Sequence, residues 1–203
     1  MYKPKVTVYI VNHNYEDYLL QAYYSVKYQS YSNIELIIID NNSETKSRDI
    51  LKKISIQDGI EVIFRRQSDL ISACNIALSK ATGEFIVRLD ADDYFRKDAI
   101  EKLVDTIVAN NADLVYPEYF EISSIGNVIN RVKHINFDNH VSLPTFPAHG
   151  ACTLLRVEAL KAIGGYDEEF DRQDGYYMWI KFLLRKNKII NTNNPLFFYR
   201  IQI

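Results

Sequence analysis

The stretch Phe85-Ile-Val-Arg-Leu-Asp-Ala-Asp-Asp-Tyr94 joins the pattern of a buried strand to a cluster of acids. Its first five residues are apolar except for Arg88, which is typical of a strand inside a sheet. Three carboxylates then follow within four positions, at Asp90, Asp92 and Asp93. Like charges packed this closely raise one another's pKa, so we expect a positive partner, and a hard divalent cation with oxygen ligands suits the position. In open α/β sheets, ligands bind just beyond the carboxyl ends of the strands, where these acids stand.

Three more strand-like runs precede this stretch, and helical patterns separate them. The predicted strands cover residues 5–11, 34–39, 60–64 and 84–89, and the predicted helices cover residues 15–29, 43–56 and 70–81, with Ser43 as a helix cap. Strands that alternate with helices of this length indicate βαβ units and a parallel sheet. Because such crossovers are right-handed, we predict an α/β fold with a mostly parallel central sheet flanked by helices.

After Arg96 the pattern becomes less regular. We predict a helix to about residue 111, a strand, turn and strand over 113–132, a loop over 134–147, a strand over 148–156, helices over 157–163 and 173–187, and an edge strand from Pro195 to Arg200. The sequence shows neither an internal repeat nor a linker, so we expect residues 1–203 to form one domain.

Composition sets limits on the class of protein. Hydrophobic residues make up 47% and charged residues 25% of the 203 residues, as in ordinary globular proteins, and the net charge of −2 gives no hint of a nucleic-acid partner. Cys74 and Cys152 have no metal-binding or disulfide spacing, so we expect two buried thiols. The start of the chain lacks the pattern of a signal peptide, and no apolar run approaches the roughly 20 residues of a membrane span. We therefore expect a cytoplasmic protein.

Polar residues follow each predicted strand of the first half, and a parallel sheet would bring them to one edge. They are Asn12-His13-Asn14, Asp40-Asn41, Arg65-Arg66 and Asp90 to Asp93. Each group alone has a plainer interpretation, such as a helix cap at 40–43 or solvated charges at Arg65 and Arg66. Together they offer polar groups for a base and ribose, cations for phosphate and acids for a metal. No GxGxxG or GxxxxGK[ST] loop is present, which disfavours dinucleotide dehydrogenases and P-loop NTPases.

Several blocks of this chain match the motifs of one family in order and spacing. They are Val8-Tyr-Ile-Val-Asn-His-Asn14, Ile38-Ile-Asp-Asn-Asn-Ser43, Asn75-Ile-Ala-Leu-Ser-Lys-Ala-Thr-Gly-Glu-Phe-Ile-Val-Arg-Leu-Asp-Ala-Asp-Asp93, Leu160-Lys-Ala-Ile-Gly-Gly-Tyr-Asp-Glu-Glu-Phe170 and Arg172-Gln-Asp-Gly-Tyr-Tyr-Met-Trp179. On these blocks the protein resembles the family 2 glycosyltransferases of GT-A fold, and the resemblance covers nearly the whole chain. The resemblance makes residues 1–95 the half that binds the nucleotide-sugar and residues 96–203 the half on the acceptor side.

The resemblance also implies an activity and its residues. It implies an inverting transferase that moves a sugar, most simply from a UDP-sugar, to a saccharide or lipid-linked acceptor in the synthesis of a surface polysaccharide or lipopolysaccharide. Asp90, Asp92 and Asp93 would bind the ribose and a Mn²⁺ or Mg²⁺ ion, with Asp92 or Asp93 as the direct ligand. The residues implied at the donor are Val11, Asn12, His13, Asp40, Asn41, Arg66, Asp90, Ala91 and Asp92. Of these, Asp40 and Asn41 would contact the base.

Asp174 is the candidate general base, because it matches the second residue of the family's Glu-Asp pair. It would take the proton of the acceptor hydroxyl, and Gln173 stands where the first acid of that pair is usual. Asn41 likewise replaces a frequent second Asp, which leaves the identity of the base open. His149 and Arg200 are further candidates for contacts with the metal or the diphosphate. Trp179 could line the acceptor site or belong to the core.

Two other functions stay open from the sequence. One is a nucleotidyltransferase that makes the nucleotide-sugar, although its usual Gly-rich loop after the first strand is missing here. The other is a catalytically silent module that binds a nucleotide or a sugar. We expect a nucleotide-sugar and an acceptor as partners, no nucleic acid, and a position either free in the cytoplasm or peripheral to the inner face of the membrane.

Overall fold

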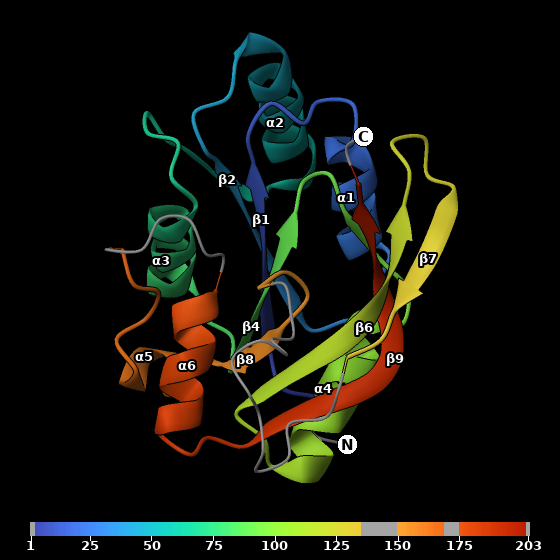
Figure 1. Ribbon diagram of the computed structural model, residues 1–203. Coiled ribbons are helices and arrows are strands. Elements are labelled where there is room, and N and C mark those ends of the chain that lie inside the picture. Colours follow the sequence, from blue (N-terminus) through green and yellow to red (C-terminus); the bar gives the residue numbers. More distant parts are fainter. Residues whose placement is uncertain (1–2, 135–149, 169–174, 202–203) are drawn as a thin grey trace.

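The structure is a computed structural model that describes residues 3–134, 150–168 and 175–201. The strands are β1 (Val6–Asn12), β2 (Ile34–Asp40), β3 (Glu61–Phe64), β4 (Phe85–Asp90), β5 (Tyr94–Phe95), β6 (Leu114–Ile122), β7 (Val128–Val132), β8 (Leu154–Arg156) and β9 (Ile189–Arg200). The helices are α1 (Leu19–Lys27), α2 (Thr45–Asp58), α3 (Leu70–Lys80), α4 (Ala99–Asn110), α5 (Val157–Ala162) and α6 (Tyr176–Leu184). All of the strands join one sheet, in the order β3-β2-β1-β4-β8-β6-β9-β5, with β7 paired to β6 (Figure 1).

The first four strands of the order form the predicted parallel unit. β1 lies between β2 and β4, and β2 pairs with β3, all in parallel. The register sets Asn12 opposite Asp40 and Val11 opposite Asp90, while Asp40 lies opposite Phe64. The four strands therefore end almost level, which confirms the prediction that their polar ends share one edge.

The other half of the sheet is mixed. β8 runs antiparallel to β4 and to β6, whereas β9 is parallel to β6 and antiparallel to β5. The prediction of an edge strand at the end of the chain is wrong, because β9 lies between β6 and β5. The strand is also longer than predicted. It begins at Ile189, and all of its pairing with β6 is long-range in sequence, so a local pattern could not reveal it.

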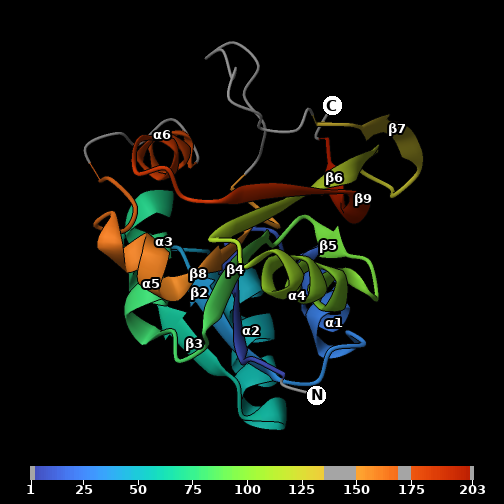
Figure 2. The same ribbon diagram turned by 90° about the horizontal axis from the view of Figure 1, so that it is seen from below.

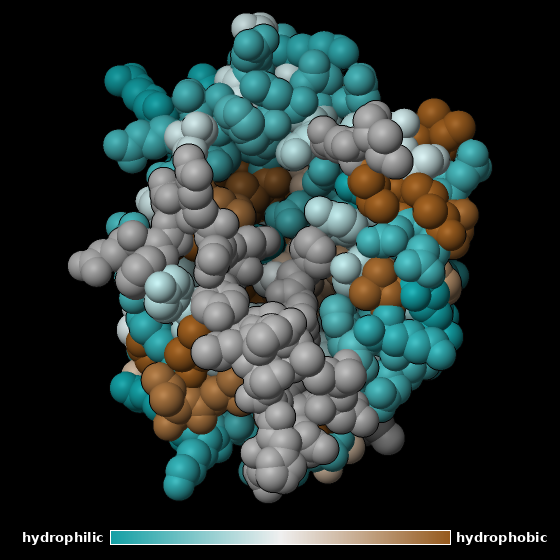
Figure 3. All heavy atoms as spheres, in the orientation of Figure 1, coloured by the Kyte–Doolittle hydropathy of each residue, from teal (hydrophilic) through white to brown (hydrophobic). Residues whose placement is uncertain are grey.

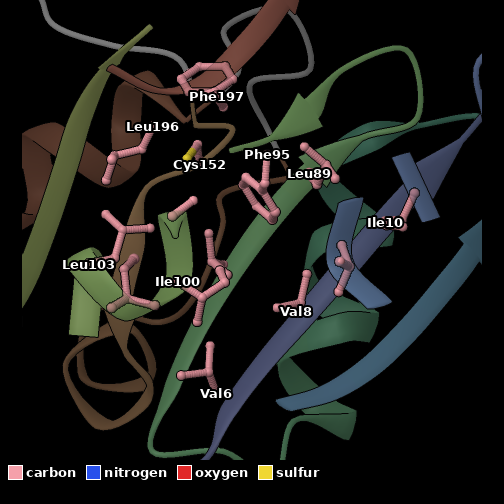
Figure 4. Close-up of a cluster of buried hydrophobic side chains, with 14 of the residues drawn as sticks. Val6, Val8, Ile10, Leu89, Phe95, Ile100, Leu103, Cys152, Leu196 and Phe197 are labelled. Atoms are coloured by element: carbon pink, nitrogen blue, oxygen red, sulfur yellow. The ribbon is translucent and has the colours of Figure 1, made fainter. Parts of the chain in front are cut away.

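Helices cover both faces of the sheet (Figure 2). α1, α2 and α4 pack on one face over a cluster that includes Val8, Ile10, Leu89 and Phe95 (Figure 4). α3, α5 and α6 pack on the other face, over a second cluster. Strands buried on both faces read as continuous apolar runs, and this explains the composition of β1, whose seven residues are all buried.

Two smaller expectations can be compared with this fold. Cys74 and Cys152 are buried and form no disulfide, as predicted. No helix in the described ranges is long and apolar enough to cross a membrane.

Candidate active site

The polar ends of β1 to β4 face a recess in the molecular surface. In the orientation of Figure 1, the space-filling view is hollowed in front of these strand ends, between the side of α2 and the side of β7 (Figure 3). The last residue of β4 and the turn after it, residues 90–93, form the acidic turn. Its carboxylates differ in burial, since Asp90 and Asp92 are partly exposed whereas Asp93 is 1% exposed.

The positive partner of Asp90 is a buried arginine of its own strand. Arg88 is 2% exposed, and its Nε lies 3.0 Å from Oδ1 of Asp90, while its Nη2 donates to Oδ2 at 3.3 Å. The contact at Nε is an ion pair, and the hydrogen bond from Nη2 gives the attraction between the two charges a direction. The positive charge expected beside the acids is therefore supplied in part by the protein. The sequence carries a signal for this contact, because residues 88 and 90 lie two apart in one predicted strand and therefore point to the same face of the sheet.

Asp93 points into the protein. Its Oδ1 accepts a hydrogen bond from the main-chain N–H of Arg200 at 2.9 Å, and its Oδ2 is buried and accepts none among the described residues. Burial raises the pKa of the Asp93 carboxyl well above its ordinary value, and the nearby charges of Asp90 and Asp92 raise that pKa further. Asp92 is thus more exposed to a ligand than Asp93 is.

Arg200 does not extend toward the recess as a phosphate ligand. Its side chain is 4% exposed, and its guanidinium lies over the ring of Tyr18, 4.2 Å from the ring centroid. Its Nε donates to the main-chain carbonyl of Asp92 at 2.8 Å. The prediction that Arg200 reaches the diphosphate is therefore wrong, because its buried guanidinium contacts Tyr18 and Asp92 within the protein.

The end of β2 forms a network of arginines and amide or acid side chains. Asp40 has no exposed side-chain surface, and its Oδ2 accepts from Nε of Arg48 at 2.8 Å. Nη1 of Arg65 donates to Oδ1 of Asn41 at 2.5 Å. Since arginine can only donate, this contact identifies the Asn41 oxygen and fixes the orientation of its amide. Arg48 was not among the sequence-based candidates, because its contact arises only when α2 packs beside β2.

The structure places the remaining donor candidates around this network. His13 is exposed, and its Nδ1 lies 2.9 Å from the main-chain oxygen of Asn41. Arg66 is exposed as well. The side chains of Val11, Asn12 and Ala91 are buried, and their contacts with a donor, like the base contact of Asp40, stay predictions.

Ser43 has a different role from the predicted helix cap. The N-cap position of α2 is Glu44, with no side-chain cap, and the Ser43 hydroxyl instead accepts from Nδ2 of Asn12 at 2.9 Å and from the main-chain N–H of Asn14 at 3.1 Å. Asn14 has φ of 59°, a left-handed conformation that asparagine adopts more readily than most residues. Ser43 therefore ties the end of β1 to the end of β2, so the cap prediction is wrong.

Several candidates on the acceptor side cannot be placed. Asp174, Gln173 and His149 lie outside the described residues. Trp179 in α6 is described and has no exposed surface, and its ring meets that of Tyr116 edge-on, with centroids 5.3 Å apart. Of its two predicted roles, the structure supports the core.

The acidic turn has the chemistry of a Mn²⁺ or Mg²⁺ site. Within the part of the chain that the structure describes, no three His, Cys, Asp or Glu side chains converge as a ready-made metal cage. Mg²⁺ is usually held by one or two carboxylates together with substrate phosphates and water, so a complete cage of protein ligands is not required. Asp92 offers an accessible carboxylate, and the buried Oδ2 of Asp93 offers an oxygen with no hydrogen-bond donor among the described residues. The residues present therefore fit such a cation.

The matching family model and the matching relatives are all glycosyltransferases. The family model described as Glycosyl transferase family 2 matches residues 7–164. The putative teichuronic acid biosynthesis glycosyltransferase TuaG of Bacillus subtilis is 30% identical over 135 residues, which cover 66% of this chain and 54% of TuaG. The chain spans about half the length of this relative, and 34% and 17% of two other curated relatives.

Two solved structures share the fold at low sequence identity. The S. aureus TarS fragment 1–349 in complex with UDP-GlcNAc is 19% identical, with a TM-score of 0.81 over 98% of this chain and 59% of the fragment. The mannosyltransferase PcManGT of Pyrobaculum calidifontis, in complex with GDP-Man and Mn²⁺, is 17% identical, with a TM-score of 0.75 over 98% of this chain and 57% of the other. These likenesses confirm the predicted α/β fold.

Proposed function

Because the chain belongs to glycosyl transferase family 2, we propose that it transfers a sugar from a nucleotide-sugar, a UDP-sugar in the first instance, to a saccharide or lipid-linked acceptor. The observation that carries this proposal is the shared edge of β1 to β4. Asn12, Asp40 and Asp90 are the last residues of three neighbouring strands, and the register sets them almost level beside a recess. TarS and PcManGT, which share the fold, were solved with UDP-GlcNAc and with GDP-Man and Mn²⁺.

The proposal divides the chain into two functional halves. Residues 1–95 would bind the donor, since they contain the four parallel strands and the acidic turn. Residues 96–203 would bind the acceptor. The relative TuaG, named as a putative teichuronic acid biosynthesis glycosyltransferase, supports a surface polymer as the kind of product. The protein would act in the cytoplasm or at the inner face of the membrane.

The acidic turn would serve the leaving group. Asp92 would hold the Mn²⁺ or Mg²⁺ ion together with the donor diphosphate, Asp93 would support it from the protein side, and Asp90 would bind the ribose. When bound, such an ion supplies Lewis-acid stabilisation of the departing diphosphate. The side chain of Asp90 is already oriented to bind the ribose, because Arg88 contacts both of its carboxylate oxygens.

The attacking group needs a base on the opposite side of the sugar. We assign this role to Asp174, which lies outside the described residues, on the basis of the family motif. Asp174 would accept the proton of the acceptor hydroxyl while its oxygen bonds to the anomeric carbon. The bond from that carbon to the diphosphate oxygen breaks in the same displacement, so the configuration inverts.

A donor panel tests the proposal directly. The melting temperature is measured with Mn²⁺ and UDP-, GDP-, CDP- or dTDP-sugars, with Mn²⁺ alone as the control. A ligand at 100 times its Kd stabilises the native state by about 2.7 kcal/mol, which raises the melting temperature by several degrees in a chain of this size. One base should give this shift. If no nucleotide-sugar shifts the transition, the proposed donor site does not exist.

The role of Asp174 has its own test. Asp174→Asn should keep the donor-induced shift, because the base does not hold the donor, but should lose transfer to the acceptor. Turnover that survives this substitution removes Asp174 from the mechanism. A donor-induced shift in the unaltered chain without transfer to any acceptor would instead favour a silent binding module.

A further inference from the structure

The structure assigns Arg200 a role as a positioning residue that holds the acidic turn in the shape needed to bind the metal with the donor diphosphate. This inference rests on the proposed function. Arg200 ends β9, and it lies more than a hundred residues from the turn in sequence. It would act through Asp92 and Asp93 and would not touch the donor.

Arg200 binds the acidic turn at two points. Its main-chain N–H donates to Oδ1 of Asp93 at 2.9 Å, and its Nε donates to the main-chain carbonyl of Asp92 at 2.8 Å. The first bond fixes a side chain and the second fixes the backbone one residue earlier. Together they set the direction in which the turn presents Asp92, and they bind that residue through its main chain.

The rest of the guanidinium is anchored to two other segments. Nη1 donates to the main-chain carbonyls of Ser123 and Ser124 at 3.1 and 2.8 Å, in the turn between β6 and β7. Nη2 donates to Oε1 of Gln21 in α1 at 2.8 Å. The acidic turn, α1 and the β6–β7 turn are therefore joined by one side chain that is 4% exposed.

Only arginine can make this set of contacts. Its planar fork carries five N–H donors in fixed directions, whereas lysine carries three on one small ammonium group. Arg200→Lys keeps the positive charge near the turn but cannot reach Asp92, Ser124 and Gln21 together. A metal site needs its ligands within about 0.5 Å of the productive geometry, so a loosened turn should bind metal less well.

The test measures how strongly Mn²⁺ and UDP assist each other's binding. Metal-free UDP affinity and UDP affinity with Mn²⁺ are measured by calorimetry, and bound Mn²⁺ is followed by the loss of the free-ion electron paramagnetic resonance signal. In Arg200→Lys we expect the gain in UDP affinity from Mn²⁺ to fall about tenfold, while metal-free UDP affinity stays within about twofold. If the donor panel selects another base, its nucleoside diphosphate replaces UDP.

Two further variants separate positioning from loss of stability. Arg156→Lys is the matched control, because Arg156 is a partly buried arginine that binds Glu84 at 2.8 Å and lies opposite the start of β4, whereas the acidic turn lies at its end. This variant should leave the gain in UDP affinity from Mn²⁺ unchanged. Gln21→Ala removes one acceptor at an exposed position, and it should lower the gain about twofold without unfolding the chain. The proposal is overturned if Arg200→Lys keeps the full gain in UDP affinity from Mn²⁺. It is also overturned if Arg200→Lys loses no more of this gain than Arg156→Lys does.

A readout without ligand distinguishes this proposal from the proposed function. The Asp93 amide donates to the Asp90 carbonyl at 3.1 Å, so its hydrogen exchange reports the closure of the turn. Exchange at this amide should be at least tenfold faster in Arg200→Lys than in Arg156→Lys. Equal exchange rates contradict the positioning role, even where UDP binds. Faster exchange in a chain that binds no nucleotide would refute the donor site while showing that Arg200 holds the turn.

Discussion

Asp92 and Asp93 are neighbours in the chain but meet different surroundings. Asp92 is partly exposed at the recess, while Asp93 is 1% exposed and accepts the main-chain N–H of Arg200. Exposure is what a carboxylate needs to bind an ion that arrives with a substrate. The two acids, which the sequence pattern could not rank, should therefore differ in their effect on metal binding.

We expect Asp92→Asn to weaken Mn²⁺ binding in the presence of UDP by about a hundredfold, since a neutral amide replaces a charged ligand. Asp93→Asn should weaken it by about tenfold or less, because Asp93 acts from inside the protein. Titration of the free Mn²⁺ signal compares the two variants. The opposite order would make Asp93 the direct ligand.

A second residue-scale prediction concerns pH and lies far from the site. Burial alone would raise the pKa of Glu35, but hydrogen bonds from Thr7 and Thr82, with a contribution from Lys5, outweigh it and lower the pKa to about 2. A carboxyl with a lowered pKa in the folded state stabilises the fold above its unfolded pKa, and that stabilisation is lost as pH falls from about 4.5 toward 2.

Glu35→Gln should therefore cost about 1–2 kcal/mol at pH 7, after allowance for solvent screening at a partly exposed side chain, and much less near pH 2. Urea unfolding at pH 7, 4 and 2.5 measures the difference from the unaltered chain. Glu61→Gln is the control, because Glu61 pairs with Lys80 at 3.2 Å with both side chains about half exposed, and its loss should cost less than about 0.5 kcal/mol. A constant cost of Glu35→Gln across this range would refute the prediction.

At the scale of elements, the start of β4 depends on a residue without a side chain. A Cβ added to Gly83 would lie 2.6 Å from the main-chain nitrogen of Thr7 and 2.8 Å from the carbonyls of Lys5 and Phe85. These atoms belong to the backbone of neighbouring strands, so they cannot move aside without disturbing the sheet. Gly83 thus allows β1 and β4 to approach each other closely.

Gly83→Ala should destabilise the fold by about 3 kcal/mol or more, or prevent soluble expression. Gly59→Ala is the comparison, because Gly59 has φ of 65° at the end of α2 but no atom within 4 Å of an added Cβ. It should cost about 1 kcal/mol, for backbone strain alone. Urea unfolding of both variants measures the loss in the free energy of unfolding. Equal losses would show that the close contacts at Gly83 are relieved easily.

The elements also show what could be predicted from the sequence. β1, β2 and β4 were predicted because strands buried on both faces appear as apolar runs, and their level ends followed from the parallel order. The position of β9 was missed, because a strand's neighbours depend on pairing over long distances in sequence. The sequence pattern predicts a helix cap at Ser43 for a related reason, since the partners of Ser43 in the structure, Asn12 and Asn14, come from another strand end.

The same distinction applies to the site. The acids at the end of β4 and the polar ends beside them could be listed from the sequence, because each follows its strand directly. The contacts that orient them could not, because they come from arginines whose side chains can turn in several directions. Arg48 contacts Asp40 only when α2 packs beside β2, and Arg88 contacts Asp90, two residues further along the same strand face, in only one of the directions open to its long side chain.

For the whole molecule, the continuous sheet predicts that both halves unfold together. β8 pairs with β4 of the first half and with β6 of the second, and β9 pairs with β5. Trp179 is the single tryptophan of the chain and is buried in α6, so its fluorescence reports the second half.

Unfolding in urea followed by Trp179 fluorescence and by far-UV circular dichroism should therefore give coincident transitions. Far-UV circular dichroism reports the helices of both halves. A fluorescence transition at a lower urea concentration would show that residues 96–203 unfold first and that the halves are separate units.

The position of β9 between β6 and β5 also has a consequence for how the protein is made. A ribosome releases a protein in order from its N-terminal side, so the four parallel strands can pair early during synthesis. The pairing of β5, and of one side of β6, must wait for β9, which lies between them and is the last of the described strands to be translated. The acidic turn waits as well, since its contacts with Arg200 form only when residue 200 has emerged. A nascent chain therefore carries the acids long before it can set them in place.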